Sequence, residues 1–210
     1  MNGDTMTMAS RSLRAERQAR TRETLVATAT PLFLSDGLAA TSLDRVADEA
    51  GFSKGAVYSN FRNKDELCLA VLDGMHRSVL DYFVAAFSSS AGSLEDRLGV
   101  FERWADRSLG EPRWTALEAE FAIRARTSAY VADALRERNQ QSRSAIEQLV
   151  LDSAERFGLT LPMPAEDVAT ALLSLGVGLG IGRANDPTIP VEVMSRTIRL
   201  MLGVPVEGRR

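Results

Sequence analysis

The chain has 210 residues, of which 45% are apolar, with a formal net charge of −3 at pH 7 and a single cysteine. This length can bury one core, or one core plus a small appended domain, and a lone cysteine excludes an internal disulfide, as is usual in a reducing cytoplasm. The longest apolar run, residues 168–181, is interrupted and is shorter than the roughly 18 to 20 residues of a membrane span. Because no secretory signal opens the sequence either, we expect a cytoplasmic protein.

Positive charge is concentrated near the amino terminus. Residues 1–64 contain nine Lys or Arg against seven Asp or Glu, whereas residues 65–210 contain 16 against 21. Both lysines of the chain, Lys54 and Lys64, fall in the first of these segments. This modest basic balance is typical of a small module that binds nucleic acid specifically. We interpret the basic residues 1–20 as a disordered tail, with a minor-groove arm as the alternative.

Residues 42–64 predict two short helices joined by a glycine turn and followed by the start of a third helix. In the first helix the apolar residues recur at helical spacing, and Gly51 can adopt the left-handed conformation that ends it. Ser53 caps the second helix, in which Val57 and Phe61 can share a buried face. Such a helix-turn-helix places its second helix in the major groove of DNA.

The opposite face of the second helix carries residues suited to contact DNA. Lys54 puts a cation in the first helical turn, where a phosphate or a guanine edge would offset its unfavourable interaction with the helix dipole. Gly55 and Ala56 leave room for a base or phosphate to approach the backbone closely. Tyr58 offers a ring to a thymine methyl and a hydroxyl to a phosphate, and Asn60 can donate to a phosphate or a base.

The helix caps on either side add candidate contacts to the DNA backbone. Asn63 and Glu66 have the spacing of a capping box, so a helix begins here with Lys64 in its first turn, where backbone amides and the amine can hold a phosphate. Thr41 and Ser42 precede the earlier helix, and their hydroxyls either cap it only or also contact a phosphate. The candidate DNA-binding residues are Thr41, Ser42, Ser53, Lys54, Gly55, Ala56, Tyr58, Asn60 and Lys64.

From about residue 21 to residue 73 the chain resembles the TetR family of bacterial transcriptional regulators. The resemblance implies an all-α homodimer that binds a palindromic DNA operator, represses transcription and is released by a small apolar or aromatic effector. The chain departs from the family pattern at Asn60, where an aromatic residue or histidine is common. The residues that carry the resemblance are Gly37, Thr41, Ser42, Val46, Ala47, Ala50, Gly51, Ser53, Gly55, Tyr58, Phe61, Lys64 and Leu67.

The rest of the chain has helical periodicity and no alternating strand pattern, so we predict an all-α fold of about nine helices. A helix from residue 64 to the serines at 88–90 would span about 35 Å and join the DNA unit to the larger second region. Further helices are expected at about 94–109, 113–126, 128–157, 165–183 and from 191 to near 203, with a polar stretch at 136–144 where the third of these could break. We therefore expect a helix-turn-helix domain at 21–62 and a regulatory, ligand-binding and dimerisation domain at 63–210.

Four glycines lie among apolar residues at 172–182. A dinucleotide-binding loop needs a different glycine spacing after a strand, so we interpret this segment as a helix with a smooth face that another helix can approach closely. In the TetR family the last two helices pair with their mates as a four-helix bundle, which this segment resembles. The candidate dimerisation residues are Leu172, Leu175, Gly176, Leu179, Val191, Met194, Ile198 and Met201.

Aromatic residues gather in the middle of the chain. The resemblance makes them candidates for lining an effector pocket, whereas their helical spacing is equally typical of a packed core. Both interpretations stay open on the sequence alone. The candidate ligand-binding residues are Phe83, Phe101, Trp104, Trp114, Phe121 and Tyr130.

The parts of an enzyme are missing from the sequence, so we predict no catalytic site, metal site or cofactor. The one histidine, His76, cannot form a two-histidine metal site, and along one helix it would lie about 12 Å from Cys68, too far for a nucleophile and its base. Cys68 is either a thiol sensor or, as a small apolar residue in a buried stripe, inert core. The alternatives to a repressor are an activator or ligand-independent regulator of the same architecture, and a helical ligand carrier without DNA binding.

Overall fold

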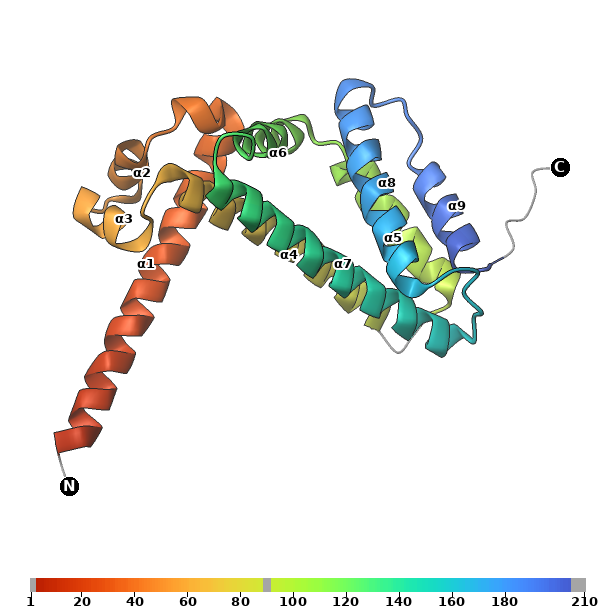
Figure 1. Cartoon of the computed structure of the whole chain (residues 1–210), viewed down its shortest axis with the longest axis horizontal. Helices are drawn as coiled ribbons and strands as arrows, with labels where there is room; N and C mark the ends of the chain where they lie inside the picture. Colours follow the sequence, from red (N-terminus) through yellow and green to blue (C-terminus); the bar gives the residue numbers. More distant parts are fainter. Residues whose placement is uncertain (1–2, 89–91, 205–210) are drawn as a thin grey trace.

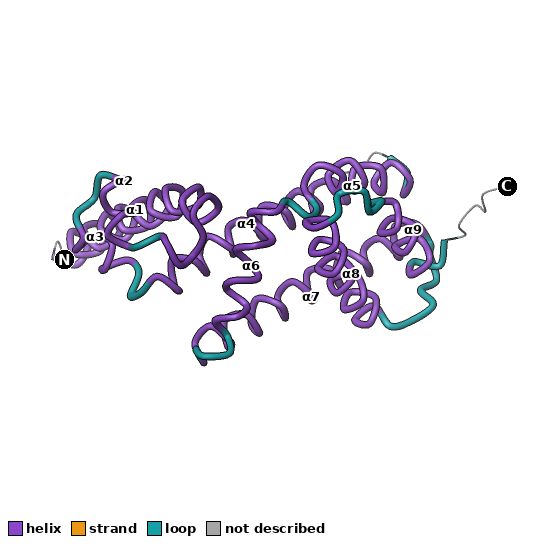
Figure 2. Tube along the Cα trace, turned by 90° about the horizontal axis from the view of Figure 1, so that it is seen from above, coloured by secondary structure: helices purple, strands orange, loops and turns teal. Residues whose placement is uncertain are grey.

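The computed structural model of the chain describes residues 3–88 and 92–204, and these residues form nine α-helices and no β-strand (Figures 1 and 2). The predicted all-α fold is therefore confirmed. The first four helices are α1 (Gly3–Ala40), α2 (Leu43–Ala50), α3 (Lys54–Asn60) and α4 (Lys64–Ser88). The others are α5 (Leu94–Ser108), α6 (Pro112–Arg124), α7 (Ala129–Phe157), α8 (Ala165–Asn185) and α9 (Glu192–Met201).

Local capping signals set the helix boundaries where the sequence predicts them. The Ser53 hydroxyl accepts a hydrogen bond from the backbone N–H of Ala56 at 3.2 Å and so begins α3. Gly51 and Gly158 adopt the left-handed conformation, with φ of 69° and 61°, and end α2 and α7. Ser93 and Asp96 form the complete capping box that was predicted at the start of α5.

The amino-terminal part of α1 differs from the disordered tail that was expected at residues 1–20. It is helical from Gly3, and in Figure 1 its first half projects away from the rest of the molecule. The side chains of residues 13–20 are exposed, so this part of the helix buries little apolar surface. Several of these residues are good helix formers, and extending a helix that the next residues have already formed avoids the cost of nucleating a new one. Residues 1 and 2 of the predicted tail lie outside the described residues.

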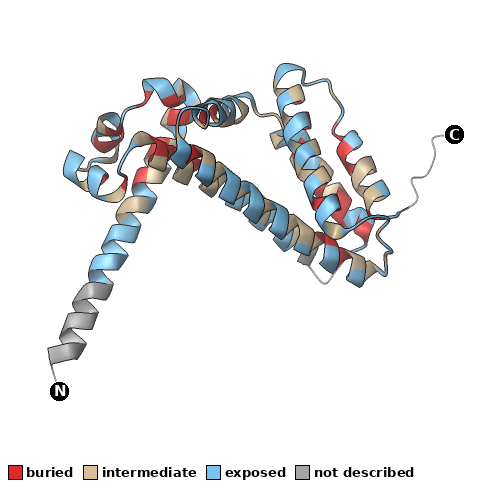
Figure 3. Cartoon of the chain, viewed as in Figure 1, coloured by how far each residue is buried: buried red, intermediate tan, exposed pale blue. Residues whose placement is uncertain are grey.

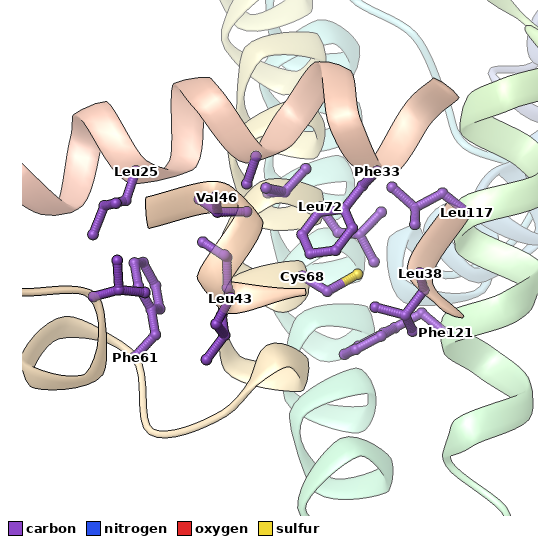
Figure 4. Close-up of a cluster of buried hydrophobic side chains, with 14 of the residues drawn as sticks. Leu25, Phe33, Leu38, Leu43, Val46, Phe61, Cys68, Leu72, Leu117 and Phe121 are labelled. Carbon is purple, nitrogen blue, oxygen red and sulfur yellow. The ribbon is translucent and has the colours of Figure 1, made fainter. Parts of the chain in front are cut away.

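The first hydrophobic core surrounds the helix-turn-helix unit and includes side chains from the region after residue 62. Side chains from α1, α2, α3 and α4 meet there with Leu117 and Phe121 of α6 and Val131 of α7, all of them buried (Figure 4). The predicted boundary at residue 62 thus does not coincide with the edge of this core. Because α6 contributes side chains to this core, a movement of α6 would change the packing around the first three helices.

A second group of buried side chains lies at the other end of the molecule, where α5, α8 and α9 pack with the end of α7. Between the two groups, the middle of α7 is exposed on much of its surface and runs beside α4 (Figures 1 and 3). Helix α7 is continuous from Ala129 to Phe157, so the polar stretch at 136–144 does not break it.

Helix α8, with 21 residues, is the one helix of the described segments that is long and apolar enough to cross a membrane by length and composition. The sequence-based expectation considered only the uninterrupted apolar run, which is shorter than the helix that contains it. In the structure α8 packs along α7 and also contacts α6 and α9. At its carboxyl end the buried Arg183 donates to the carbonyl oxygen of Leu109 at 3.0 Å, which ties the helix to the loop between α5 and α6.

Candidate nucleic-acid interface

Helix α3 divides into the two faces that its sequence predicts. Val57, and Phe61 directly after the end of α3, are fully buried against the neighbouring helices. Lys54, Gly55 and Tyr58 are exposed. Tyr58 is 54% exposed, more than the other two tyrosines of the chain, Tyr82 at 41% and Tyr130 at 39%. The exposed face therefore combines a cation, an aromatic ring and a glycine within five residues.

Lys54 has an anionic partner within the protein. Its Nζ lies 2.5 Å from Oδ2 of Asp44 in α2, and both side chains are exposed. The hydrogen bond to Asp44 and the charge of that carboxylate raise the pKa of Lys54 above its ordinary value. The anion that the sequence required near this cation is therefore supplied by α2, and a DNA phosphate or base would have to displace it.

Lys64 also has a partner inside the chain. Its Nζ donates to the carbonyl oxygen of Ala39 at 3.1 Å, so the amine joins the start of α4 to the end of α1. The predicted capping box next to it is only half formed. Asn63 Oδ1 accepts from the N–H of Glu66 at 2.8 Å, but the Glu66 carboxylate accepts from the N–H of Arg62, one residue before the cap, at 2.9 Å.

Thr41 and Ser42 have different roles. The Ser42 hydroxyl accepts from the N–H of Arg45 at 3.1 Å and caps α2, and its side chain is exposed. Thr41 is fully buried, and its hydroxyl donates to the carbonyl oxygen of Gly37 at 3.0 Å. Ser42 and not Thr41 therefore caps α2, because the Thr41 hydroxyl satisfies a carbonyl at the end of α1 instead, and a contact of Thr41 with DNA stays a prediction.

The carboxyl end of α3 is held by Arg22, which sequence reasoning did not single out. The Nη1 of Arg22 donates to the carbonyl oxygen of Asn60 at 2.6 Å. The Asn60 side chain folds back along the helix, where its Nδ2 donates to the carbonyl oxygen of Ala56 at 2.8 Å. Asn60 thus uses its side-chain donor within α3. Arg22 lies 38 residues from its partner and has no local motif that would mark it.

Comparison with known proteins identifies the family of the helix-turn-helix unit. Residues 25–71 match the model described as bacterial regulatory proteins, tetR family. The HTH-type transcriptional regulator TtgR of Pseudomonas putida is 38% identical over 63 residues, which are 30% of this chain and 30% of TtgR. That alignment thus leaves most of both proteins unmatched.

Solved structures extend the likeness to most of the chain. The crystal structure of E. coli NemR in its reduced form covers 89% of this chain and 99% of its own, with a TM-score of 0.70 and 21% identity. A transcriptional regulator from Rhodococcus sp. Rha1 covers 87% of this chain and 94% of its own, with a TM-score of 0.58 and 27% identity. Residues 25–71 are therefore a TetR-family amino-terminal unit, and the likeness of the rest of the chain to these solved structures is one of fold.

The six aromatic residues that the TetR resemblance made candidates for an effector pocket do not share one site. Phe83, Phe101 and Trp104 form a cluster in which the rings of Phe83 and Trp104 meet edge to face at 4.8 Å between centroids. Phe121 is fully buried in the core of the amino-terminal unit. Tyr130 lies 5.8 Å from the guanidinium of Arg62, next to the carboxyl end of α3.

Trp114, the remaining aromatic candidate, belongs to a polar cluster between α4, α6 and α7. Its ring meets the ring of His76 edge to face at 5.6 Å, and His76 Nε2 is hydrogen-bonded to Glu118 Oε1. Burial alone would raise the pKa of Glu118, but the hydrogen bond and charge of His76 hold it below its ordinary value. The indole N–H of Trp114 lowers the pKa of Glu118 further, although this N–H makes no hydrogen bond of ordinary geometry. Burial raises the pKa of Asp73 in the same cluster, against the opposing charge of Arg138.

Two hollows in the surface of the described residues are lined by residues other than the aromatic candidates. One, of about 250 Å³, lies between polar residues of α7 and α8. The second, of about 270 Å³, lies where α6 meets the ends of α1 and α4, and is lined by Leu38, Ala39, Lys64, Glu120, Ile123 and Arg124. Neither hollow supports the predicted aromatic effector pocket.

Several of the predicted dimerisation residues are buried in the core of the single chain. Leu179, Val191 and Met194 are buried within the chain, where α8 and α9 pack against α5. The outward apolar residues are different ones. They are Val177, 55% exposed, and Ile181, 51% exposed, on α8, together with Val193 and Leu200 on α9. Leu172, Leu175, Gly176, Ile198 and Met201 are partly buried.

Proposed function

We propose that this TetR-family protein is a DNA-binding transcriptional regulator that binds a palindromic operator as a homodimer. It acts as a repressor and is released by a small apolar or aromatic effector. The observation that carries the proposal is the exposed face of α3, where Lys54, Gly55 and Tyr58 lie side by side on a helix whose other face is buried. Such a helix fits the major groove, with its first residues near the base edges.

Gly55 supports a close approach by DNA. A Cβ at this position would meet only the Ser53 hydroxyl, at 3.9 Å, so the packing of the protein itself does not require a glycine. Glycine within a helix costs about 1 kcal/mol relative to alanine. A residue that weakens the helix without any internal need is explained by a partner that comes close to the backbone.

Two copies are needed because a helix of seven residues reads only a few base pairs. A homodimer places two such helices about one turn of DNA apart, so that they bind the two halves of a palindrome. The exposed apolar residues Val177 and Ile181 of α8 provide a face that a second copy can cover.

Release by an effector requires that the ligand prefer one of two conformations of the dimer. Helix α6 is suited to pass on such a preference. One part of it, with Trp114 and Glu118, lies in the polar cluster with His76, and another, with Leu117 and Phe121, lies in the core of the DNA unit. A ligand that displaced α6 would therefore change the packing around α3.

The proposal is tested by replacing two glycines. Purified protein selects DNA fragments, and fluorescence anisotropy then gives the affinity for the selected duplex. Gly55→Ala should raise thermal stability slightly, by about 0.5 to 1 kcal/mol, and weaken operator binding about tenfold. Gly74→Ala is the matched control, because a Cβ at Gly74 in α4 would also meet nothing within 4 Å. It should stabilise the protein to a similar extent without changing DNA affinity.

The other functions give different outcomes. If no duplex is selected and retained, the proposed DNA binding fails, and the alternative of a ligand carrier without DNA binding is favoured. A reporter gene behind the selected operator separates repression from activation by the sign of its change. Equal operator affinity for Gly55→Ala and the unaltered protein would remove α3 from the interface.

A further inference from the structure

We propose that Arg22 of α1 is a positioning residue that fixes the carboxyl end of α3 and thereby the angle at which α3 enters the DNA groove. This inference rests on the proposed DNA-binding function. Arg22 precedes the helix-turn-helix by about twenty residues in the sequence, yet it contacts the last residue of α3 and the two elements that follow it.

Three contacts place the guanidinium of Arg22. Its Nη1 donates to the carbonyl oxygen of Asn60 at 2.6 Å. Its central carbon lies 4.1 Å from the centroid of the Phe61 ring. Its Nη1 is also 3.9 Å from Oε1 of Glu66, in the first turn of α4. One side chain of α1 thus contacts the last residue of α3, the residue after it and the next helix.

The chemistry of a helix end explains why a cation belongs there. The last carbonyl groups of a helix have no partner within it and carry the negative end of the helix dipole. The Asn60 carbonyl is one of these groups, and the charged donor of Arg22 satisfies it. The stack on Phe61 adds a cation–π interaction with a ring that is itself fully buried and therefore fixed.

Helix α3 depends on such contacts because seven residues do not make a stable helix alone. Its amino end is held by the Ser53 cap and by the ion pair of Lys54 with Asp44. Its carboxyl end is held by Arg22. With both ends fixed, the face that carries Tyr58 has one orientation relative to α1 and, in a dimer, relative to the second copy.

Glu66 connects this arrangement to the turn that follows α3. Its carboxylate accepts from the N–H of Arg62 at 2.9 Å and from Arg62 Nε at 3.2 Å, in addition to its contact with Arg22. The ion pair alone contributes little, because the Arg22 side chain is 41% exposed. The planar guanidinium, which donates and stacks at once, is the feature that lysine lacks.

The test compares Arg22→Ala and Arg22→Lys with Arg20→Ala, a matched control that removes the same charge from an exposed position of α1. Anisotropy titrations with the selected operator and with a scrambled duplex, at several salt concentrations, give affinity, specificity and salt dependence. We expect Arg22→Ala to lower operator affinity about tenfold and the scrambled-duplex affinity much less, so that specificity falls. Arg22→Lys should recover little of this loss, because lysine cannot stack and donate in the same way. Arg20→Ala should leave the specificity unchanged.

A phosphate contact by Arg22 would behave differently. It would lower the affinity for both duplexes together and reduce the salt slope by about one, and Arg22→Lys would restore it. That result, or an unchanged specificity in Arg22→Ala, would overturn the positioning role.

Hydrogen exchange of the free protein tests the same role without DNA. In Arg22→Ala the amides of residues 58–62 should exchange faster, while those of α2 keep their protection. If the unaltered protein binds no duplex, the proposed function fails, and this measurement still decides whether Arg22 holds the end of α3. Equal exchange in the variant and the unaltered protein would contradict the inference. Global loss of protection would show unfolding, in which case Arg22→Met, which keeps the length of the side chain but cannot donate to the Asn60 carbonyl, replaces the alanine variant in both measurements, with the same expected results.

Discussion

Glu120 of α6 accepts a hydrogen bond from the backbone N–H of Leu38, with 2.8 Å between Oε2 and N. The contact lies where α1 is interrupted at Gly37, whose φ of 80° and ψ of 171° are accessible to glycine but strained for other residues. A Cβ at Gly37 would lie 2.9 Å from Oε1 of Glu120, so the carboxylate occupies the space that the missing side chain leaves. Helix α6 is thereby attached to the carboxyl end of α1.

Replacing Glu120 should weaken the attachment of α6 to α1 and lower the stability of the protein. Glu120→Ala removes a charged acceptor from a partly buried backbone donor, and we expect a loss of about 1 to 3 kcal/mol in the free energy of unfolding. Urea denaturation monitored by circular dichroism measures it. Glu155→Ala, on an exposed part of α7, is the control and should cost less than about 0.5 kcal/mol. Equal stabilities of the two variants would show that the contact with Leu38 contributes nothing.

Cys68 should be inert in the folded protein. Burial, followed by the negative charge of Asp65, raises the pKa of the thiol to about 12, and the side chain lies inside the core in Figure 4. Because the thiolate is the reactive form, a thiol reagent at pH 8 should label Cys68 only after the protein is unfolded in urea. Peroxide should likewise leave operator affinity unchanged. Fast labelling of the native protein would instead support the thiol-sensor alternative.

The interaction of Glu118 with His76 should give stability that depends on pH. Because the pKa of Glu118 is lowered in the folded chain relative to the ordinary 4.5, the stabilisation is fully present above the unfolded value and is lost as pH falls through the folded one. The unfolding free energies of Glu118→Gln and the unaltered protein, measured by urea denaturation, should therefore differ at about pH 5 and converge as the pH falls through the lowered pKa of Glu118. His76→Gln should show the same convergence, since it removes the partner. A difference that stays constant down to about pH 3 would rule out this linkage.

The sequence was sufficient for features that depend on neighbouring residues. Ser53, Gly51 and Gly158 act within four residues of themselves, so their capping roles could be predicted and are found in the structure. The division of α3 into two faces also follows from its own spacing. These local signals, with the TetR resemblance, were enough to predict the helices and to propose the candidate DNA-binding face.

Long-range features could not be predicted in the same way. Arg22 could not be singled out among the several arginines near the amino terminus, because its partner is a backbone carbonyl 38 residues away. The inner face of α8 could not be chosen because both of its faces are apolar, so helical periodicity does not distinguish Leu179 from Val177. Helical spacing also does not distinguish an aromatic residue that lines a pocket from one that packs in a core, so the aromatic candidates could not be assigned to either.

The outward face of α8 provides the last prediction. If a second copy covers Val177 and Ile181, a charge placed there should prevent association, because burying an unpaired charge costs several kcal/mol. Val177→Arg should therefore convert a dimer to a monomer in analytical ultracentrifugation and abolish cooperative binding to the full palindrome. The control is Ile123→Arg, at a 66% exposed position of α6, which should stay dimeric. Leu179→Ala should cost about 2 to 5 kcal/mol of stability through a cavity in the chain's own core while leaving the folded fraction dimeric. A dimer that survives Val177→Arg would place the contact between the copies on another surface.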